Sequence, residues 1–325
     1  GKLDLTAAEG IIDLIDADTD AQRRQALRQA SGALSQLYER WRQELIGARA
    51  LMESAIDFSD EADVSASAEK QALAEAARLS AEISNHLKDG RRGEIVREGF
   101  RIVLAGPPNV GKSSLMNALA RRDVAIVSEE PGTTRDVLEV RLDLDGYMAI
   151  VADTAGLREA AGAVEQEGIR RALNRAEEAD LVLWIIDATA PLPDVPTDLG
   201  GHGRHVLRVL NKIDAASARR DIPSDHAISA RTGTGISELV GNLGRIVHEA
   251  TDGASDKPVI TQLRHRQQIE ACLDALKAVS SSSTHGPELA AEQLRIAADA
   301  LGRIVGRIDP EDVLDQVFAR FCIGK

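Results

Sequence analysis

Hydrophobic side chains in the first hundred residues recur at three- and four-residue steps, which is the spacing of one face of an α-helix. The pattern predicts a short helix opened by the capping-box sequence TAAE at residues 6–9, a long helix over residues 19–56 and a third over residues 67–87. Residues 89–99, DGRRGEIVREG, predict a polar connector. The apolar face of the long helix is expected to consist of Leu27, Ala30, Leu34, Leu37, Trp41, Leu45, Ala48 and Met52.

From residue 100 the pattern changes to short apolar runs that alternate with helical stretches, which is typical of a mostly parallel sheet covered on both faces. A turn at Asp145-Gly146 joins residues 137–144 to residues 147–152 and predicts one antiparallel hairpin. The other expected strands and helices lie in residues 100–106, 165–178, 181–187, 205–211, 225–230 and 236–249.

After residue 253 the chain becomes helical again. The expected helices and breaks are a helix over 261–279, a loop at 280–283, a helix over 288–307, and an N-cap at Asp309 with Pro310 before a last helix and the tail FCIGK. Neither flank makes a large core by itself. We therefore expect a discontinuous all-α helical domain from residues 1–97 and 253–325, with an α/β domain inserted at 98–252.

Composition narrows the class of protein. The 325 residues carry a net charge of −13 and few aromatic side chains, which argues against a protein that coats nucleic acid but leaves room for a local basic patch. No apolar run approaches the roughly 20 residues of a membrane span. The two cysteines lie far apart in the sequence, which fits a reducing cytosol better than a disulfide framework. We expect a cytoplasmic protein with no membrane contact.

Residues 106–113, GPPNVGKS, match the phosphate-binding pattern G-x-x-x-x-G-K-[ST] and lie between an expected strand and an expected helix. The backbone N–H groups of such a loop bind phosphate oxygens. Lys112 is expected to reach the β- and γ-phosphates, and the Ser113 hydroxyl to bind Mg²⁺. The alternative is a simple glycine turn, and the motifs that follow argue against it.

Three further motifs follow in the order of a GTP-binding domain. Asp153 ends an apolar strand, where its carboxylate can hold the water shell of Mg²⁺, and Gly156 has a backbone N–H that can sense the γ-phosphate. In the sequence NKID, Asp214 can accept from guanine N1–H and the 2-amino group, donors that adenine lacks in that arrangement, and Asn211 can bond the other edge of the ring. The sequence SAR at Ser229–Arg231 can offer a backbone N–H to guanine O6. The expected substrate is GTP.

Two switch segments complete the expected site. The first, residues 121–136, contains Thr133 and Thr134, which are candidates for contact with the γ-phosphate and Mg²⁺. The second, DTAGLREAAGAVEQ, carries Leu157 where many signalling GTPases have the glutamine that orients the attacking water. Leucine cannot hydrogen-bond water. The residues alone leave two possibilities open: an inactive GTP-binding module, or hydrolysis that relies on another group.

The motifs resemble those of the MnmE (TrmE) family of tRNA-modification GTPases, and the resemblance covers essentially the whole chain. It is carried by the segments GKLDLTAAEGIIDLIDA, GPPNVGKSSLMNALA, AIVSEEPGTTRDV, DTAGLREA, NKID, SARTGTGI and FCIGK. The resemblance implies a Ras-like P-loop GTPase domain inserted into a helical domain. It also implies that the family's N-terminal folate-binding domain is missing from this sequence.

The same resemblance implies how the nucleotide and its ions are held. GTP contacts are implied for Asn109, Val110, Gly111, Lys112, Ser113, Ser114, Ser128, Thr133, Thr134, Asp153, Thr154, Ala155, Gly156, Asn211, Lys212, Asp214, Ser229, Ala230 and Arg231. Mg²⁺ would be bound by Ser113 and Thr134, and by Asp153 through water. In place of an arginine finger, the resemblance implies G domains that pair across the nucleotides and a K⁺ ion beside the phosphates that supplies the positive charge. The implied K⁺ ligands are Asn109, Ser128, Glu130 and Thr133.

The family's water-orienting glutamate aligns with Glu165, so Glu165 and Lys112 are the implied catalytic residues. From the residues alone, Glu165 is also an ordinary acidic residue at the start of a helix. The expected cation loop is more acidic than the family pattern because of Glu129 and Glu130, which either help to hold K⁺ or face water. In the tail, Cys322 is implied in modification and Lys325 on the folate and tRNA side; packing is the alternative role for Cys322.

The implied function is K⁺-stimulated hydrolysis of GTP to GDP and phosphate, driven by dimerisation of the G domains in a homodimer. This reaction would serve the 5-carboxymethylaminomethyl or aminomethyl modification of the tRNA wobble uridine, together with the FAD-dependent partner MnmG and a one-carbon folate. A GTP-controlled ribosome-assembly or scaffold switch is the alternative. It is disfavoured because the sequence has no GXXG-bearing KH pattern and the FCIGK tail has no role in it.

Overall fold

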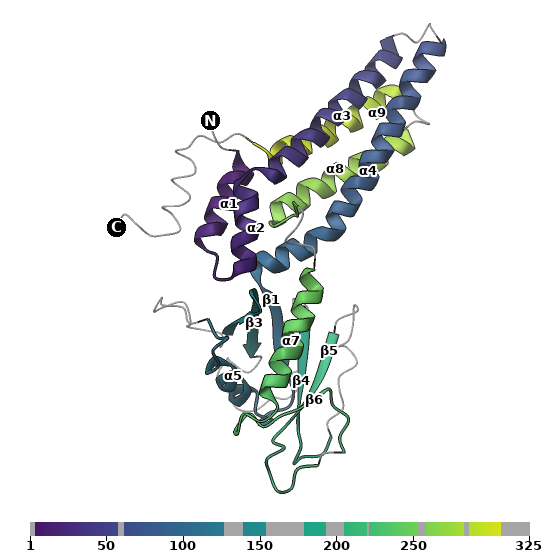
Figure 1. Cartoon of the computed structure of the whole chain (residues 1–325). Coiled ribbons are helices and arrows are strands. Elements are labelled where there is room, and N and C mark those ends of the chain that lie inside the picture. Colours follow the sequence, from purple (N-terminus) through teal and green to yellow (C-terminus); the bar gives the residue numbers. More distant parts are fainter. Residues whose placement is uncertain are drawn as a thin grey trace, which may run out of the picture. The chain divides into compact units, whose positions relative to one another are not determined.

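The structure is a computed structural model of the chain, and it describes residues 4–57, 62–126, 139–153, 179–192, 205–219, 221–252, 258–282 and 286–306. By their internal contacts these residues form two compact units, whose elements are labelled in Figure 1. The helical unit comprises the described parts of Gly1–Ala17, Gln22–Arg97 and Thr251–Lys325. The sheet unit comprises the described parts of Asp18–Ala21 and Glu98–Ala250.

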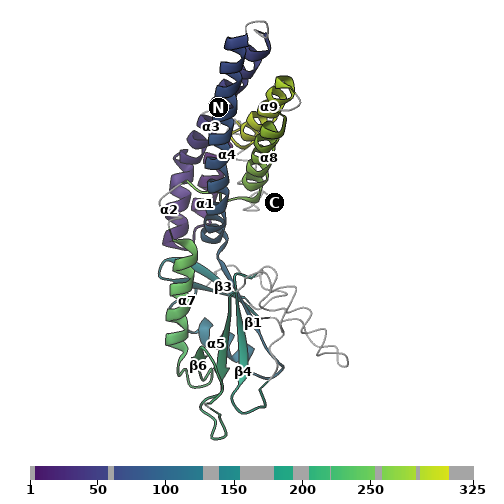
Figure 2. The same ribbon diagram turned by 90° about the vertical axis from the view of Figure 1, so that its right-hand side faces the viewer.

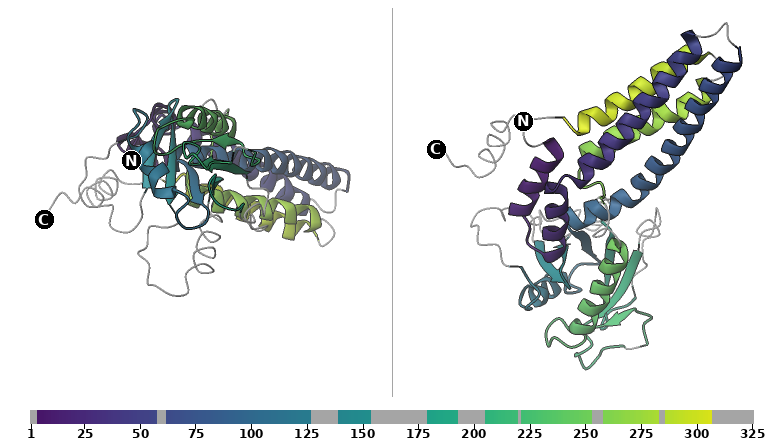
Figure 3. Two further views of the ribbon diagram at one scale, coloured as in Figure 1. Left: turned by 90° about the horizontal axis from the view of Figure 1, so that it is seen from below. Right: turned by 45° about the horizontal axis from the view of Figure 1, so that its top comes forward.

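The helical unit combines helices from both ends of the chain. Its helices are α1 (Leu5–Ile15), α2 (Asp20–Ala30), α3 (Ala33–Asp57), α4 (Ala62–Glu98), α8 (Leu263–Ser282) and α9 (Pro287–Ile304). The yellow α9 lies beside α3 and also packs against α8 (Figure 3). Their apolar faces enclose one core, which includes Tyr38, Trp41, Leu45, Met52, Leu79, Ile83, Ile269, Leu294 and Leu301. Because side chains from both flanks fill this core, neither flank would bury its apolar face without the other.

The first helix begins two residues earlier than the capping box predicts. Asp4 is the N-cap of α1, and its Oδ1 accepts hydrogen bonds from the Ala7 backbone N–H at 2.9 Å and from Thr6 Oγ1 at 2.8 Å. Glu9 is not a capping residue, because its carboxylate accepts from Arg264 Nη2 at 2.6 Å and from His265 Nε2 at 2.9 Å. The capping-box pattern did not predict this role for Glu9, because its partners Arg264 and His265 come from the C-terminal part of the chain.

The long helix predicted over residues 19–56 is two helices. Helix α2 ends at Ala30 and α3 begins at Ala33, with Gly32 between them at φ +82°, a left-handed conformation that favours glycine. Leu27, expected on the buried face, is 47% exposed, whereas Leu34, Trp41, Leu45 and Met52 are buried as predicted. The sequence predicted one helix because apolar residues keep the same three- and four-residue spacing on both sides of the break.

The polar connector predicted at residues 89–99 is also wrong, since α4 continues as a helix to Glu98. The glycines of this stretch serve close packing. A Cβ on Gly93 would lie 2.3 Å from the Ile260 carbonyl oxygen, and one on Gly90 would lie 2.9 Å from Ile260 Cδ1. Glycine destabilises a helix interior, but here it allows the segment that contains Val259 and Ile260 to pack closely against α4, and this packing offsets the loss. Likewise α8 continues to Ser282, through part of the predicted 280–283 loop.

The sheet unit contains a six-stranded sheet among the described residues, in the order β2-β3-β1-β4-β5-β6. Its strands are β1 (Phe100–Ala105), β2 (Glu139–Leu144), β3 (Tyr147–Asp153), β4 (Leu181–Asp187), β5 (His205–Asn211) and the two-residue β6 (His226–Ala227). All neighbours run parallel except β2 and β3, which form the predicted hairpin with Asp145 and Gly146 at positive φ.

Helix α5 (Lys112–Ala120) packs against β2 and β3, and α7 (Ile236–Thr251) lies along the sheet (Figure 2). The predicted fold class, a mostly parallel α/β domain inserted into a discontinuous helical domain, is confirmed. The helix predicted near residues 165–178 and the N-cap predicted at Asp309 and Pro310 lie outside the described residues.

A partly buried histidine makes the helical unit sensitive to acid. His86 Nε2 lies 3.0 Å from the Tyr38 hydroxyl and its ring stands edge-on to Trp41, and burial lowers the pKa of His86 to about 4 from 6.5 although Asp89 acts in the opposite direction. Protonation thus favours the unfolded state. Stability is complete above pH 6.5, and we expect it to fall by about 3 kcal/mol as the pH drops from 6.5 to 4.

Chemical denaturation of the helical unit across this pH range checks the expectation. His86→Gln is the matched variant, because glutamine keeps an acceptor for Tyr38 and does not titrate. Its unfolding free energy should vary far less between pH 6.5 and 4. An equal loss of stability in both proteins would assign the acid sensitivity to other groups.

Candidate nucleotide-binding site

The phosphate-loop sequence Gly106–Ser113 connects β1 to α5 at the carboxyl end of the sheet. Two of its glycines are required by close contacts. A Cβ on Gly106, at φ +143°, would lie 2.5 Å from the Ile185 carbonyl oxygen, and one on Gly111, at φ +101°, would lie 2.3 Å from Asn211 Nδ2. Asn109 also adopts a left-handed conformation, with φ +61°. The loop thus curls tightly in front of the N-terminus of α5, where backbone N–H groups attract anions.

Lys112 and Ser113 open helix α5. The Lys112 ammonium donates to the carbonyl oxygens of Gly106 and Pro107, both at 2.8 Å, and so closes the loop on itself. Burial lowers the pKa of Lys112, and the nearby Asp153 carboxylate opposes this effect. The Ser113 hydroxyl donates to Oδ2 of the fully buried Asp153, at 3.1 Å.

The donor chemistry at Ser113 and Asp153 fits Mg²⁺. A hydroxyl oxygen and a carboxylate oxygen are hard ligands, and Mg²⁺ in nucleotide sites uses few protein ligands beside phosphate and water oxygens. The described residues contain no group of three or more histidine, cysteine, aspartate or glutamate side chains that could hold a metal.

Asn211 at the end of β5 ties two loops together. Its Nδ2 donates to the Val110 carbonyl oxygen at 2.9 Å, and its Oδ1 accepts from the Ala230 N–H at 3.0 Å. The side chain is buried, and it thereby fixes the phosphate loop relative to the SAR loop. Its contact with the guanine ring stays a prediction.

Asp214 lies in the loop after β5. Its Oδ1 accepts from the buried Ser229 hydroxyl at 2.6 Å, and its Oδ2 lies 2.5 Å from Nη2 of the exposed Arg231. The hydrogen bond from Ser229 is the largest influence on this carboxyl and lowers its pKa, with Arg231 adding to the effect. Asp214 is therefore an oriented, ionised acceptor, as recognition of a guanine edge requires.

Sequence reasoning missed Asp187, which ends β4 in register with Asn211. Its Oδ2 accepts from Lys212 Nζ at 2.6 Å, and the same ammonium donates to the Asn109 carbonyl oxygen at 2.7 Å. The available signal was a carboxylate at the carboxyl end of an apolar strand, the same signal that singled out Asp153.

The structure thus brings together the site residues of the phosphate loop, the ends of β3 and β5 and the SAR loop. The other predicted site residues lie outside the described residues: Ser128, Glu130, Thr133, Thr134, Thr154, Ala155, Gly156, Glu165, Cys322 and Lys325.

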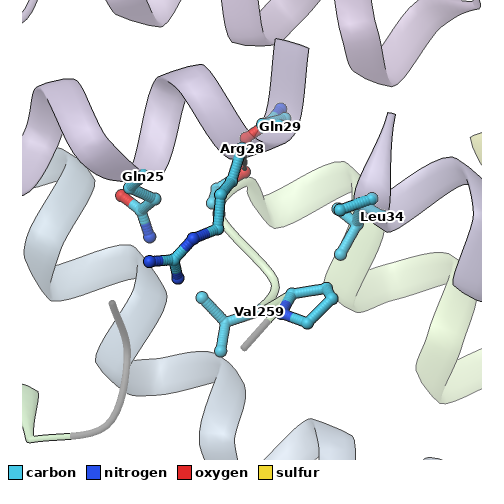
Figure 4. Close-up of a pocket in the computed structure, with 8 residues that line it drawn as sticks. Gln25, Arg28, Gln29, Leu34 and Val259 are labelled. Carbon is cyan, nitrogen blue, oxygen red and sulfur yellow. Dashed lines mark hydrogen bonds between the residues drawn. The ribbon is translucent and has the colours of Figure 1, made fainter. Parts of the chain in front are cut away.

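A separate small pocket occurs in the helical unit (Figure 4). Its cavity volume of about 20 Å³ is enough for a water molecule and far below that of a ligand site, and it opens to solvent. The side chain of Arg28 extends between Gln25 and Val259 (Figure 4), and Thr261 Oγ1 donates to Gln29 Oε1 at 2.9 Å. None of the predicted nucleotide-binding residues lines this pocket.

Comparison with known proteins decides the family. Residues 5–322 match the MnmE helical domain family. The chain belongs to the MnmE family. It is 52% identical over 332 residues to the tRNA modification GTPase MnmE of Rhodopseudomonas palustris, and 51% identical over 329 residues to that of Parvibaculum lavamentivorans. Each match covers 100% of this chain and 73% of the relative.

Solved structures also match parts of the chain. The G domain of the T. maritima FeoB iron transporter is 24% identical, with a TM-score of 0.32, over 47% of this chain and 99% of that one. A point variant of Aquifex aeolicus Era bound to GDP.AlF4- is 25% identical, with a TM-score of 0.34, over 54% of this chain and 66% of that one. Among the described helices, none is long and apolar enough to cross a membrane.

Proposed function

We propose that this chain hydrolyses GTP to GDP and phosphate and acts in tRNA modification. The observation that carries the proposal is the convergence of the Gly106–Ser113 loop, Asp153 and the NKID and SAR sequences at one edge of a parallel sheet. Membership of the MnmE family supports the tRNA part. We propose that the α/β domain over residues 98–252 binds the nucleotide and that residues 1–97 and 253–325 form the helical domain.

In this mechanism the protein binds both the guanine base and the phosphates of the nucleotide. Asp214 accepts hydrogen bonds from the guanine edge, while backbone N–H groups of residues 109–114 and the Lys112 ammonium bind the phosphates. Ser113 and Thr134 would hold Mg²⁺, with Asp153 acting through a water molecule; a bound Mg²⁺ neutralises charge on the β- and γ-phosphates. Lys112 donates to two loop carbonyls, so its ammonium already lies at the loop that the phosphates enter.

The attacking water requires a group other than Leu157. We propose that Glu165 orients it, and that Asn109, with Ser128, Glu130 and Thr133, binds a K⁺ ion where two G domains pair. A monovalent cation at that place offsets the negative charge of the transition state. The proposed target is the wobble uridine of tRNA, and MnmG is the proposed partner in its carboxymethylaminomethyl or aminomethyl modification. We place Cys322 in this modification and Lys325 on the folate and tRNA side.

Potassium dependence tests the proposed chemistry. At equal ionic strength, we expect GTP turnover in KCl to exceed that in NaCl by on the order of 10²-fold, because one transition-state charge partner is worth about that much. Glu165→Ala should lower turnover in KCl by on the order of 10²-fold while nucleotide binding persists.

Glu167→Ala is the matched control, since it removes a carboxylate two residues away. It should keep K⁺-stimulated turnover. In cells that depend on the variant gene, mass spectrometry of tRNA nucleosides should show wobble-uridine modification with Glu167→Ala and its loss with Glu165→Ala. Equal turnover in both salts would contradict the K⁺ mechanism, and normal modification without GTP turnover would favour a switch or scaffold.

A further inference from the structure

The carboxylate of Asp187 is held in one orientation. Its Oδ1 accepts from the Thr189 N–H at 2.8 Å and from Thr189 Oγ1 at 2.7 Å, which leaves Oδ2 directed at the Lys212 ammonium, 2.6 Å away. The Asp187 side chain is only 13% exposed. Burial opposes its ionisation, but the hydrogen bonds from Lys212 and Thr189 outweigh burial and lower the pKa of Asp187.

Lys212 carries this contact to the phosphate loop. The ammonium that pairs with Asp187 also donates to the Asn109 carbonyl oxygen, at 2.7 Å. Three segments that lie far apart in the sequence, the end of β4, the loop after β5 and the phosphate loop, are thus joined through one lysine side chain. A lysine without Asp187 would keep only one of these two acceptors and would be free to turn toward water.

The backbone at both ends of this connection is left-handed, a conformation that asparagine adopts more readily than lysine. Asn109 has φ +61° and Lys212 has φ +65°, and neither is a glycine. Left-handed conformations of ordinary residues persist where surrounding contacts hold them, and they cluster at functional sites. Asn211 holds the next residue of the loop through the Val110 carbonyl oxygen. Lys212 therefore supplies a second, separate restraint at Asn109.

We propose that Asp187 is a positioning residue that acts through Lys212 to hold the phosphate loop in its nucleotide-binding conformation. The inference rests on the proposed binding of GTP and adds a residue outside the known sequence motifs. Asp187 touches neither base nor phosphate in this role. It couples the base-recognition loop to the phosphate loop, because the lysine of NKID is fixed only while its carboxylate partner is present.

The experiment is a double-mutant cycle with Asp187→Asn, Lys212→Met and the double variant, read out by the rate of GDP dissociation. Each single variant should release GDP about tenfold faster, the effect of one lost charge-assisted hydrogen bond. The double variant should release GDP no faster than the faster single variant, because both act on one connection. Asp180→Asn is the matched control: its carboxylate accepts from the Arg101 N–H at the opposite end of β4.

Amide hydrogen exchange supplies a readout apart from nucleotide release. Exchange of the Val110 and Gly111 amides should speed up in Asp187→Asn without nucleotide and stay unchanged in Asp180→Asn. Thr189→Ala, which loosens the carboxylate and keeps its charge, should give a smaller change of the same kind. Multiplicative effects in the double variant, or faster GDP release with unchanged loop exchange, would overturn the proposal. A parent protein that binds no GDP would instead overturn the proposed function.

Discussion

Asp214→Asn should change the preferred base from guanine to xanthine. Guanine presents two donors, N1–H and the 2-amino group, to the Asp214 carboxylate, whereas xanthine has a carbonyl oxygen at C2, which the amide NH₂ of asparagine can contact as a donor. Ser229 Oγ holds the present carboxylate at 2.6 Å, and an asparagine Oδ1 can accept the same bond. The orientation of the side chain should therefore survive the substitution while its donor and acceptor pattern changes.

We expect GTP affinity to fall by about 10³-fold or more and XTP to become the better ligand, since a site built around specific hydrogen bonds strongly rejects a mismatched partner. Competition of GTP and XTP for the purified protein measures this. Asp225→Asn is the control, because that carboxylate accepts from the Arg208 N–H and belongs to none of the motifs. Unchanged GTP affinity in Asp214→Asn would remove Asp214 from base recognition.

The sequence predicted correctly those turns and strands that are determined by neighbouring residues alone. The hairpin at Asp145-Gly146 formed because two residues with positive φ suit its tight turn, and the strands of the parallel sheet formed from continuous apolar runs. The glycines showed the limit of this reasoning. Gly32 ended a helix as its residue type allows, although the apolar stripe continued past it. Gly90 and Gly93 did not end α4, because the distant segment that contains Val259 and Ile260 packs against them.

The sequence predicted the site residues that belong to known motifs. It did not predict the hydrogen bonds between side chains of different motifs. Lys112, Asp153 and Asp214 lie at the carboxyl edge of the sheet, where strand ends bring them together. The sequence did not show that the Asn211 amide spans two loops, nor that Asp187 lies beside Lys212, because both contacts depend on the pairing of β4 with β5.

Gly111→Ala should strongly weaken nucleotide binding without unfolding the helical unit. The new Cβ would lie 2.3 Å from Asn211 Nδ2, at a backbone φ of +101° that alanine rarely adopts. Asn211 cannot turn away at low cost, since it is 2% exposed and its amide bonds Val110 and Ala230. Overpacking and left-handed strain together should destabilise the sheet unit by about 3 kcal/mol. Displacement of the loop should weaken GDP binding by more than about a hundredfold.

Gly146→Ala separates the two causes. Gly146 has a similar φ of +87°, but its Cβ would meet only Asp20 Cβ at an ordinary 3.7 Å, in the hairpin turn at the opposite end of β3 from Asp153. It should cost about 1 kcal/mol of stability and leave GDP affinity within about twofold. Calorimetric titration with GDP and thermal unfolding of both variants measure the two effects. Equal losses of stability would mean that backbone strain, and not the contact with Asn211, accounts for the cost of a side chain at Gly111. An unchanged GDP affinity in Gly111→Ala would contradict the prediction. A loss of stability in Gly111→Ala that exceeds the loss in Gly146→Ala would assign the excess to the contact with Asn211.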